Sequence, residues 1–295
     1  MVNKKSTGDY IFDTFNYIFL SVLALVTLYP FIHVICGAIS GPGMLIGHKG
    51  ALLWPLGTPT LKAFGLVFRN PNILTGYRNT VFVLVTATAL NILMTSLGAY
   101  VCSRQQFAIR NALMFMIIFT MYFGGGMIPR YLFLKNYLGM GDHLWSLIIP
   151  GAISAYNLII MRNAFSGVPA SLEESARIDG ANDITIMFRI IMPLSKATIA
   201  VMVLFYGVGH WNTWFDAMIF LRTRTLYPLQ LILREILVDA STQSMTMGLS
   251  NDDVEALSDN LKYATIIVAT LPILCVYPFI QKYFVKGVMI GAEKG

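Results

Sequence analysis

Six long, mostly apolar stretches constrain this chain more than any other feature. They cover roughly 15–39, 78–102, 110–129, 144–165, 197–221 and 261–284. A helix needs about 20 apolar residues to cross the hydrocarbon of a bilayer. Backbone groups in lipid must find their partners within the protein, so spanning segments are helices or closed barrels. The stretches predict an all-α integral membrane protein with six transmembrane helices.

The composition supports a lipid environment. Of the 295 residues, 56% are hydrophobic and only 12% are charged, whereas soluble domains carry about 25% charged residues. The net charge of +6 comes from scattered basic residues, a distribution that argues against a nucleic-acid partner. Cys36, Cys102 and Cys275 are far apart in sequence and indicate neither a disulfide framework nor a metal site.

Six spans place both termini on one side. The positive-inside rule favours the cytoplasm for that side by a small margin. We therefore expect a cytoplasmic N-terminus over 1–14, a membrane domain over 15–284 and a cytoplasmic tail over 285–295. The outer segments are then 40–77, 130–143 and 222–260. The first apolar stretch lacks a small-residue cleavage site and is expected to stay attached.

Residues 171–193, SLEESARIDGANDITIMFRIIMP, form a polar segment between the fourth and fifth spans. Ser171 followed by Glu174 has the spacing of a capping box, which predicts a short helix ending near Asp179. Gly180 then suits the left-handed conformation that ends a helix. The segment is therefore expected to begin with one short helix and a tight turn.

A second short helix is expected after the turn. Asn182 or Asp183 can cap it, and Pro193 is expected to end it or kink it into the fifth span. Apolar residues recur at helical spacing along one face, at Ile184, Met187, Phe188 and Ile191. Such a helix pair either lies in the lipid headgroups or docks into a groove of a partner. Its acidic polar face favours the protein partner.

The segment resembles the EAA loop of permease subunits in bacterial ABC importers. The matching residues are Glu174-Ser175-Ala176, Asp179-Gly180-Ala181, Phe188 and Met192-Pro193. Ser175 replaces an alanine of the family pattern, Met192 replaces a leucine, and a proline often found further on is missing. LIIMRNAFSGVPASLEE, GHWNTWFDAMIF and QKYFVKGVMIGAEKG are similar to the carbohydrate branch, the second permease of the maltose type. The resemblance covers roughly 78–295.

This resemblance implies a type I ABC importer permease fold in the bacterial cytoplasmic membrane. The loop would be a cytoplasmic coupling helix that docks in a cleft of a separate ATPase dimer. Its docking residues would be Glu174, Ser175, Ala176, Asp179, Gly180, Ala181, Phe188 and Pro193. For Glu174 and Asp179, local helix capping is the alternative to contact with the ATPase. The other implied partners are a second permease subunit, an extracytoplasmic sugar-binding protein and an oligosaccharide.

Energy and substrate recognition are expected to be divided between subunits. The chain has no GxxxxGK[ST] motif, so ATP and Mg²⁺ are expected on the partner ATPase and no cofactor or catalysis on this chain. Polar groups within spans often line a water-filled path. Candidates for a sugar path are Asn91, Tyr156, Asn157, His210, Trp211, Asn212 and Trp214. Helix packing or an interfacial aromatic belt is the alternative for each.

The long outer segment is expected to meet the binding protein. By resemblance its tip would be Ser241, Thr242, Gln243, Ser244, Met245, Thr246, Met247 and Gly248, within a candidate stretch to Asn251. It would either insert into the binding protein or form a docking surface without insertion. GPGMLIGHKG and TMYFGGGMIPRYL look like permeases for oligosaccharides of complex polysaccharides. An acidic sugar would favour a cation such as Arg130 on the path.

Three other functions were weighed against this one. The same architecture could import peptides or amino acids, against which the Trp-Asn span and the tail argue. An ion-driven secondary transporter should show mid-span carboxylates or repeated half-helices, and neither is evident in the sequence. A membrane enzyme should show a catalytic constellation, and no such motif is evident.

Overall fold

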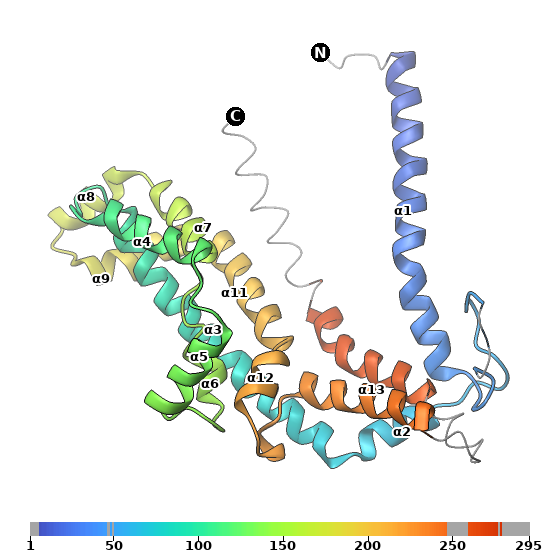
Figure 1. Cartoon of the computed structure of the whole chain (residues 1–295). Coiled ribbons are helices and arrows are strands. Elements are labelled where there is room, and N and C mark those ends of the chain that lie inside the picture. Colours follow the sequence, from blue (N-terminus) through green and yellow to red (C-terminus); the bar gives the residue numbers. More distant parts are fainter. Residues whose placement is uncertain (1–5, 46–47, 49, 247–258, 277, 279–295) are drawn as a thin grey trace. The chain divides into compact units, whose positions relative to one another are not determined.

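The computed structural model describes residues 6–45, 48, 50–246, 259–276 and 278, and these form helices without a strand (Figure 1). The helices are α1 Thr7–Ile39, α2 Lys62–Arg69, α3 Pro71–Ser103, α4 Arg110–Tyr122, α5 Met127–Leu132, α6 Trp145–Ile148, α7 Ala155–Ser166, α8 Ala170–Ile178, α9 Asp183–Ile186, α10 Met192–Leu194, α11 Lys196–Trp211, α12 Phe215–Phe220 and α13 Leu229–Thr246. Shorter elements are the π-helices η1 Phe133–Tyr137 and η2 Met187–Ile191 and the 3-10 turn η3 Arg224–Leu226. A further helix covers Asp259–Val276. The chain divides into two compact units, Met1–Pro71 with Leu233–Leu271 and Asn72–Ile232 with Pro272–Gly295.

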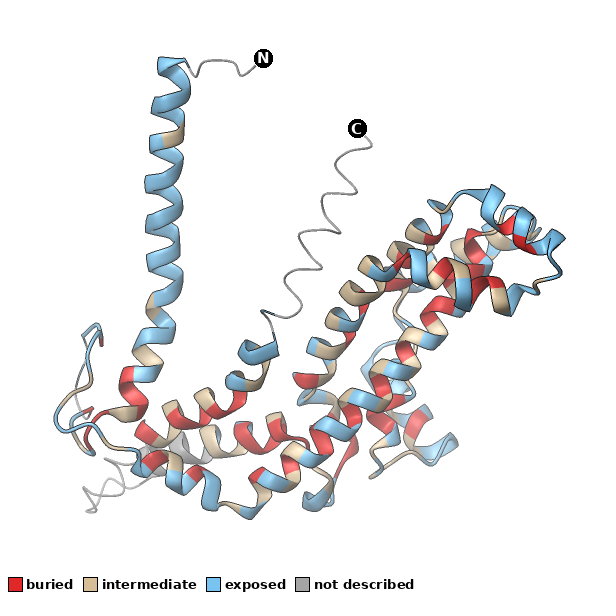
Figure 2. Ribbon diagram, turned by 180° about the vertical axis from the view of Figure 1, so that it is seen from behind, coloured by how far each residue is buried: buried red, intermediate tan, exposed pale blue. Residues whose placement is uncertain are grey.

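The first unit is built on α1, which is apolar on all sides. Its side chains are exposed along most of its length, and burial begins only at Cys36, Gly37 and Ala38 (Figure 2). There the Asn260 amide donates to the carbonyl oxygens of Gly37 at 2.8 Å and of Ser40 at 3.0 Å. These bonds satisfy carbonyls at the helix end that have no partner within the helix. An apolar helix exposed all round requires lipid or another protein around it.

The second unit is organised along α3. At 33 residues this helix is about 50 Å long. One apolar cluster joins its C-terminal part to α7, the segment 176–191 and α11 through Ala99, Tyr100, Met161, Phe165, Ala176, Ile186, Met187, Ile191, Met202 and Tyr206. A second joins its N-terminal part to α6, α12 and α13 through Val83, Ala87, Leu147, Ile148, Ala217, Leu221 and Leu231. The helix therefore connects two packed regions.

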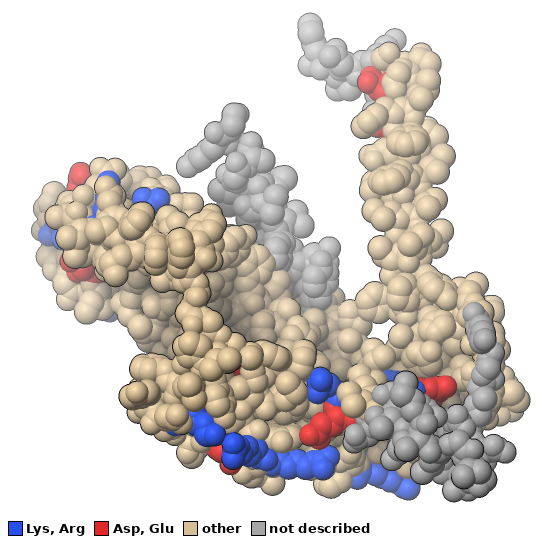
Figure 3. Space-filling view, viewed as in Figure 1, with Lys and Arg blue, Asp and Glu red and all other residues tan. Residues whose placement is uncertain are grey.

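The charges of the second unit lie at its ends. Figure 3 shows acidic and basic side chains around α8, mainly basic side chains with a few acidic ones at the opposite end, and a largely uncharged surface between them. A bilayer-spanning protein needs this distribution, because a charge in the hydrocarbon is costly.

The described residues do not by themselves give the six spans expected from the sequence. Among the described residues, three helices are long and apolar enough to cross a membrane: Thr7–Ile39, Pro71–Ser103 and Asp259–Val276. Up to five spans result if each of two bent pairs counts as one. These are Arg110–Tyr122 with Met127–Tyr137, bent by 110°, and Asp183–Leu194 with Lys196–Trp211, bent by 87°. The count of six spans stays a prediction, as do the boundaries at 14/15 and 284/285.

The expected fourth span, 144–165, is not one continuous helix. It consists of α6 and α7, and residues 149–154 between them are not helical. Pro150 lacks the amide hydrogen that would continue a helix. The side-chain amide of Asn91 donates to the Gly151 carbonyl, and the backbone amide of Ser154 donates to the Tyr206 hydroxyl at 3.0 Å. Non-helical backbone at membrane depth needs such partners.

Candidate functional site

The polar segment 171–193 forms two short helices joined at Gly180, as expected. Gly180 has a φ of +85°, a conformation that costs glycine little and other residues more. Its amide donates to the Arg177 carbonyl at 3.0 Å, and the Ala181 amide donates to the Ala176 carbonyl at 2.9 Å. These two bonds are those of a Schellman motif, which ends α8. The turn is thus fixed by backbone hydrogen bonds that depend on Gly180.

The start of α8 differs from the expected capping box. The helix begins at Ala170 with Pro169 as its N-cap, and Ser171 lies within the first turn. Pro169 is held in an extended conformation with ψ of 131° and provides no side-chain acceptor. Ser171 and Glu174 therefore do not cap each other, and Glu174 is exposed. The Glu174 carboxylate therefore does not serve as a cap at the start of α8.

The second helix begins and ends where the sequence predicts. The Asn182 side-chain oxygen accepts a hydrogen bond from the Thr185 amide at 2.8 Å and caps α9. Pro193 lies in the short α10, immediately before the 87° bend into α11. The expected apolar stripe is only partly correct. Met187 and Ile191 are buried together with Ile186, whereas Ile184 and Phe188 are exposed, so the buried face is centred on Ile186 and Met187.

The outward face of the segment carries large apolar side chains. Ile178 is 87% exposed, Ile184 67% and Phe188 44%. Ile178 precedes the Gly180 turn and Ile184 follows it, so the two apolar side chains flank it in sequence. Phe188 is a predicted docking residue, whereas the sequence analysis did not predict Ile178 and Ile184 as such. Of the remaining predicted ones, Glu174, Ser175, Asp179, Gly180 and Pro193 are exposed, Ala181 is half-buried and Ala176 is buried in the core. Exposed apolar groups of this size are typical of interaction sites.

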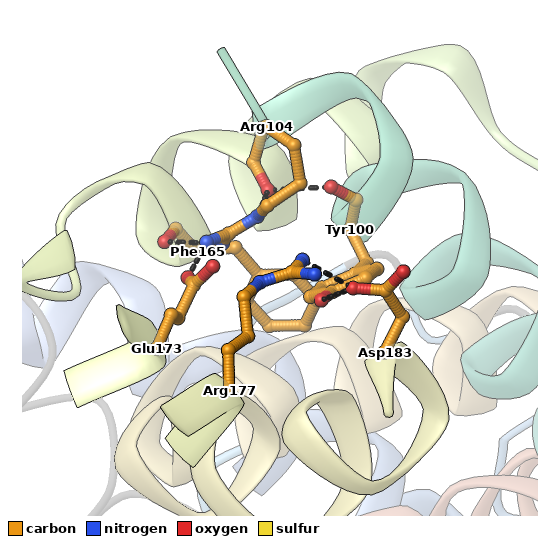
Figure 4. A network of polar contacts seen from close by, with 7 residues as sticks. Tyr100, Arg104, Phe165, Glu173, Arg177 and Asp183 are labelled. Atoms are coloured by element: carbon orange, nitrogen blue, oxygen red, sulfur yellow. Dashed lines mark hydrogen bonds and ion pairs between the residues drawn. The ribbon is translucent and has the colours of Figure 1, made fainter. Parts of the chain in front are cut away.

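The inward face is held by ion pairs (Figure 4). Glu173 is buried and pairs with Arg104, just beyond the end of α3. Tyr100 donates from its hydroxyl to the Asp183 carboxylate at 3.1 Å, and Arg177 also pairs with Asp183. Sequence reasoning placed Glu173 on the polar face without a partner. Arg104 lies 69 residues earlier, and no local pattern links the two.

A cavity of about 390 Å³ with a mostly apolar lining lies near His143 in the second unit, but a smaller one is richer in hydrogen-bonding groups. This second cavity, of about 270 Å³, is lined by Arg130, Leu147, Gly151, Ser154, Asn157, Phe205, Tyr206, Gly209, His210, Thr213 and Asp216. Arg130 donates to both carboxylate oxygens of Asp216, at 3.1 and 2.9 Å. We call this the Arg130–Asp216 cavity. It lies beside the break at 149–154.

The structure brings together only some of the predicted path residues. His210 and Asn157 line the Arg130–Asp216 cavity, and Asn91 contacts His210 with 2.7 Å between Nε2 and Oδ1. Trp211 is buried, with its ring 6.3 Å from that of Tyr77. The remaining three candidates are not among the cavity residues: Tyr156, Asn212 and Trp214. Asn212 donates to Val208 on its own helix.

A polar anchor joins two of the segments that are predicted to lie on the outer side, 130–143 and 222–260. The Asp142 carboxylate accepts from the Arg222 and Thr223 amides, each at 2.8 Å, and from the Thr223 hydroxyl. These hydrogen bonds, led by the Thr223 hydroxyl, lower the pKa of Asp142 to about 2. Of the residues expected to contact a binding protein, 241–246 lie in α13. Met247 and Gly248 lie outside the described residues, as does the tail 285–295.

Comparison with known proteins identifies the family. No protein-family model matches the chain. The polygalacturonan/rhamnogalacturonan transport system permease protein YtcP of Bacillus subtilis is 42% identical over 285 residues, which cover 97% of this chain and 99% of that protein. The maltodextrin transport system permease protein MdxG of the same organism is 27% identical over 99% of this chain and 100% of its own length.

A solved structure agrees with these sequences. A chain of a bacterial ABC transporter involved in the import of the acidic polysaccharide alginate matches with a TM-score of 0.84 and 33% identity, over 96% of this chain and 100% of that chain. The similarity extends over nearly the whole length in each case, so it is not confined to one segment. The chain belongs to the carbohydrate ABC transporter permeases, membrane subunits of importers for sugars and oligosaccharides.

Proposed function

We propose that residues 171–193 are the element through which this permease binds a separate ATPase dimer. The observation that carries the proposal is the pair of exposed side chains Ile178 and Ile184 beside the Gly180 turn. An amphipathic helix that docks in a groove buries such anchors in its partner. The outward carboxylates of Glu174 and Asp179 provide polar contacts at the rim, which set orientation more than affinity.

The alternative location, in the lipid headgroups, fits less well. Interfacial helices carry Lys and Arg on the polar face, where they meet anionic lipids. Here Arg177 is paired with Asp183, and two carboxylates, of Glu174 and Asp179, are exposed. These charges favour a protein with basic groups over a membrane surface.

The rest of the importer follows from this assignment. The loop and both termini are cytoplasmic, and the membrane is the bacterial cytoplasmic membrane. The chain is one half of a heterodimeric permease, whose other half contacts its exposed apolar helices. ATP and Mg²⁺ are bound by the ATPase, and this chain is non-catalytic. An extracytoplasmic binding protein delivers the substrate and meets the outer segment 222–260.

The substrate in this proposal is an oligosaccharide that carries carboxylates. Relatives named for polygalacturonan and for alginate support this class. The Arg130–Asp216 cavity supports it as well, because a guanidinium binds a carboxylate with two parallel hydrogen bonds. His210, Asn157 and Thr213 on the same cavity are suited to sugar hydroxyls. Peptide or amino-acid import remains the competing function, and uptake of labelled sugar in vesicles distinguishes the two.

The docking assignment is tested by Gly180→Pro. Proline cannot adopt a φ of +85° and loses the amide that donates to Arg177. Gly180→Asn is the matched control, because asparagine tolerates the left-handed conformation and no atom lies within 4 Å of the added Cβ. The permease pair is co-expressed with its ATPase and purified through a tag on this chain.

Gly180→Pro should lose the ATPase and the hydrolysis stimulated by the loaded binding protein, while Gly180→Asn keeps both. Monodisperse permease in both variants shows that the membrane subunits are folded. An intact, stimulated complex with Gly180→Pro would mean that residues 171–193 are not the docking element.

A further inference from the structure

We propose that Arg104, Glu173, Tyr100 and Asp183 are positioning residues that fasten the docking loop to the end of α3, so that movement of the loop is transmitted along this helix. The inference rests on the proposed function, since it concerns what happens after the ATPase has bound. It adds a division within the loop. The exposed apolar side chains bind the ATPase, and two acids that contact Tyr100 and Arg104, the exposed Asp183 and the buried Glu173, make α3 the recipient of the movement.

Arg104 joins three elements at one point. Its guanidinium pairs with Glu173 of α8 and donates to the Phe165 carbonyl of α7 at 3.2 Å. Its Nε donates to Ser103 Oγ, at the end of α3, at 3.0 Å. The Arg104 and Glu173 side chains are only 17% and 10% exposed. A buried carboxylate strongly disfavours loss of its cation, so this pair resists separation when the loop is pulled.

Tyr100 extends the fastening to the second short helix. The Arg104 guanidinium lies over its ring, 4.8 Å from the centroid, and its hydroxyl donates to Asp183 at the start of α9. Arg177 of α8 pairs with the same Asp183 carboxylate. Figure 4 shows the side chains converging between α3 and the two helices. Tyr100 in the last turn of α3 therefore contacts α9, and Arg104 just after α3 contacts α8. Arg177 joins the two short helices to each other.

The same face of the loop also packs against α3 through apolar side chains. Ala176, Ile186 and Met187 belong to the apolar cluster that contains Ala99 and Tyr100 of α3. Close-packed interiors transmit displacement instead of absorbing it. The ion pairs give this contact a fixed orientation, because a guanidinium has its donors in a rigid fork.

Further along, α3 contacts the wall of the Arg130–Asp216 cavity. Asn91 donates to Gly151 in the break of the fourth predicted span, and Thr95 bonds Tyr206, which accepts from Ser154. Asn91 lies 13 residues before Arg104, which is about 20 Å along a helix. A single uninterrupted helix thus contacts the docking loop near one end and the cavity wall further along. A displacement of the loop reaches the cavity through α3.

The test measures sugar transported per ATP hydrolysed by the full complex in proteoliposomes. The sugar-loaded binding protein is supplied on the side of the membrane where it contacts the permease. The variants are Arg104→Met, Glu173→Gln and their combination. Arg110→Met is the matched control, because Arg110 is a half-buried arginine on the same predicted side of the membrane and outside the docking loop. The Arg104 and Glu173 variants should retain the ATPase but lose about tenfold in transport per ATP, within the usual range of coupling energies, whereas Arg110→Met should keep both.

The double variant should lose no more than either single variant, because both remove one interaction. A purely structural role would lower assembly, hydrolysis and transport together and leave their ratio unchanged. If the single variants do not assemble, Arg104→Glu combined with Glu173→Arg decides. An assembled complex with a restored ratio supports the inference, and an unassembled or uncoupled one overturns it.

An unchanged ratio in Arg104→Met, or additive losses in the double variant, would overturn the inference alone. The proposed function fails through a different result, retention of the ATPase by Gly180→Pro. Loss of the ATPase from both the Arg104 single variant and the charge-swapped variant would place the pair in assembly and would also overturn the role in transmission.

Discussion

The Tyr206 hydroxyl accepts a hydrogen bond from the Ser154 amide at 3.0 Å and shares one with the Thr95 hydroxyl at 2.7 Å. This one buried oxygen holds the first turn of α7, the middle of α3 and α11 together. Tyr206→Phe should destabilise the permease by about 1–2 kcal/mol, because an amide in non-helical backbone loses its partner. Denaturant titration of the purified subunit in detergent measures this loss.

Tyr156→Phe is the matched control for that measurement. Tyr156 lies near the start of α7, beside the same break, but is 57% exposed, so removal of its hydroxyl should change stability by less than about 0.5 kcal/mol. Equal effects of the two substitutions would mean that the Tyr206 hydroxyl has no special role at the break.

Asp142 should stay ionised to unusually low pH. Its folded pKa of about 2 lies below the ordinary 3.8, so its anchoring contributes stability above pH about 4 and is lost as the pH falls toward 2. A ¹³C carboxyl titration should place its midpoint near 2. A midpoint near 4 would mean that the bonds to Arg222 and Thr223 do not persist in solution.

Asp142→Ala tests the same anchor at neutral pH. The Arg222 and Thr223 amides should exchange hydrogen faster, because each loses its acceptor. Asp142→Asn is the gentler comparison, since asparagine also tolerates the φ of 58° found here and keeps one acceptor oxygen. Unchanged exchange in Asp142→Ala would contradict the anchor.

Much of the docking loop was predictable because its signals are local. Gly180, Asn182 and Pro193 each determine the backbone within a few residues, and the structure confirms all three roles. The capping box was wrong because Pro169 starts the helix before Ser171. The expected stripe was partly wrong because the buried face includes Ile186 and leaves Ile184 and Phe188 exposed.

Contacts between distant residues were not predictable in the same way. The spacing of Glu173 says nothing of Arg104, and the polarity of Asn91 does not reveal the Gly151 carbonyl that it meets. The break at 149–154 was missed because hydropathy averages over a window, and the apolar residues on either side hide Pro150. The side chains that bond to the backbone of an interrupted helix can be identified only from the packing of the helices.

Ile178 should be an anchor of ATPase binding without being needed for folding. It is 87% exposed, so Ile178→Ser should change the stability of the permease by less than about 0.5 kcal/mol. Loss of a buried anchor at an interface typically costs about 2 kcal/mol or more, which is roughly a thirtyfold weaker affinity for the ATPase. Titration of the ATPase onto nanodisc-embedded permease measures it.

Ile109→Ser serves as the control for that titration. Ile109 is 58% exposed and lies on the same predicted side of the membrane, but outside the docking loop. Its substitution should leave the affinity unchanged. An equal loss from both substitutions would point to a general effect of surface hydrophobicity, and no loss from Ile178→Ser would remove it from the interface.

The Arg130–Asp216 pair should set preference between charged and neutral sugars. Asp216→Asn frees Arg130 for a substrate carboxylate, and Arg130→Met removes the cation. With one binding protein throughout, uptake of a galacturonate trimer is compared with that of its methyl ester, which has the same rings without the charges. A charge-assisted hydrogen bond contributes about 1.5–3 kcal/mol, so the preference for the acid should fall roughly tenfold or more in Arg130→Met and rise in Asp216→Asn. Lys135→Met, another basic residue of the outer segment, should leave it unchanged. An equal ratio of acid to ester uptake in all three variants and the native chain would mean that the cavity does not distinguish charged from neutral sugars.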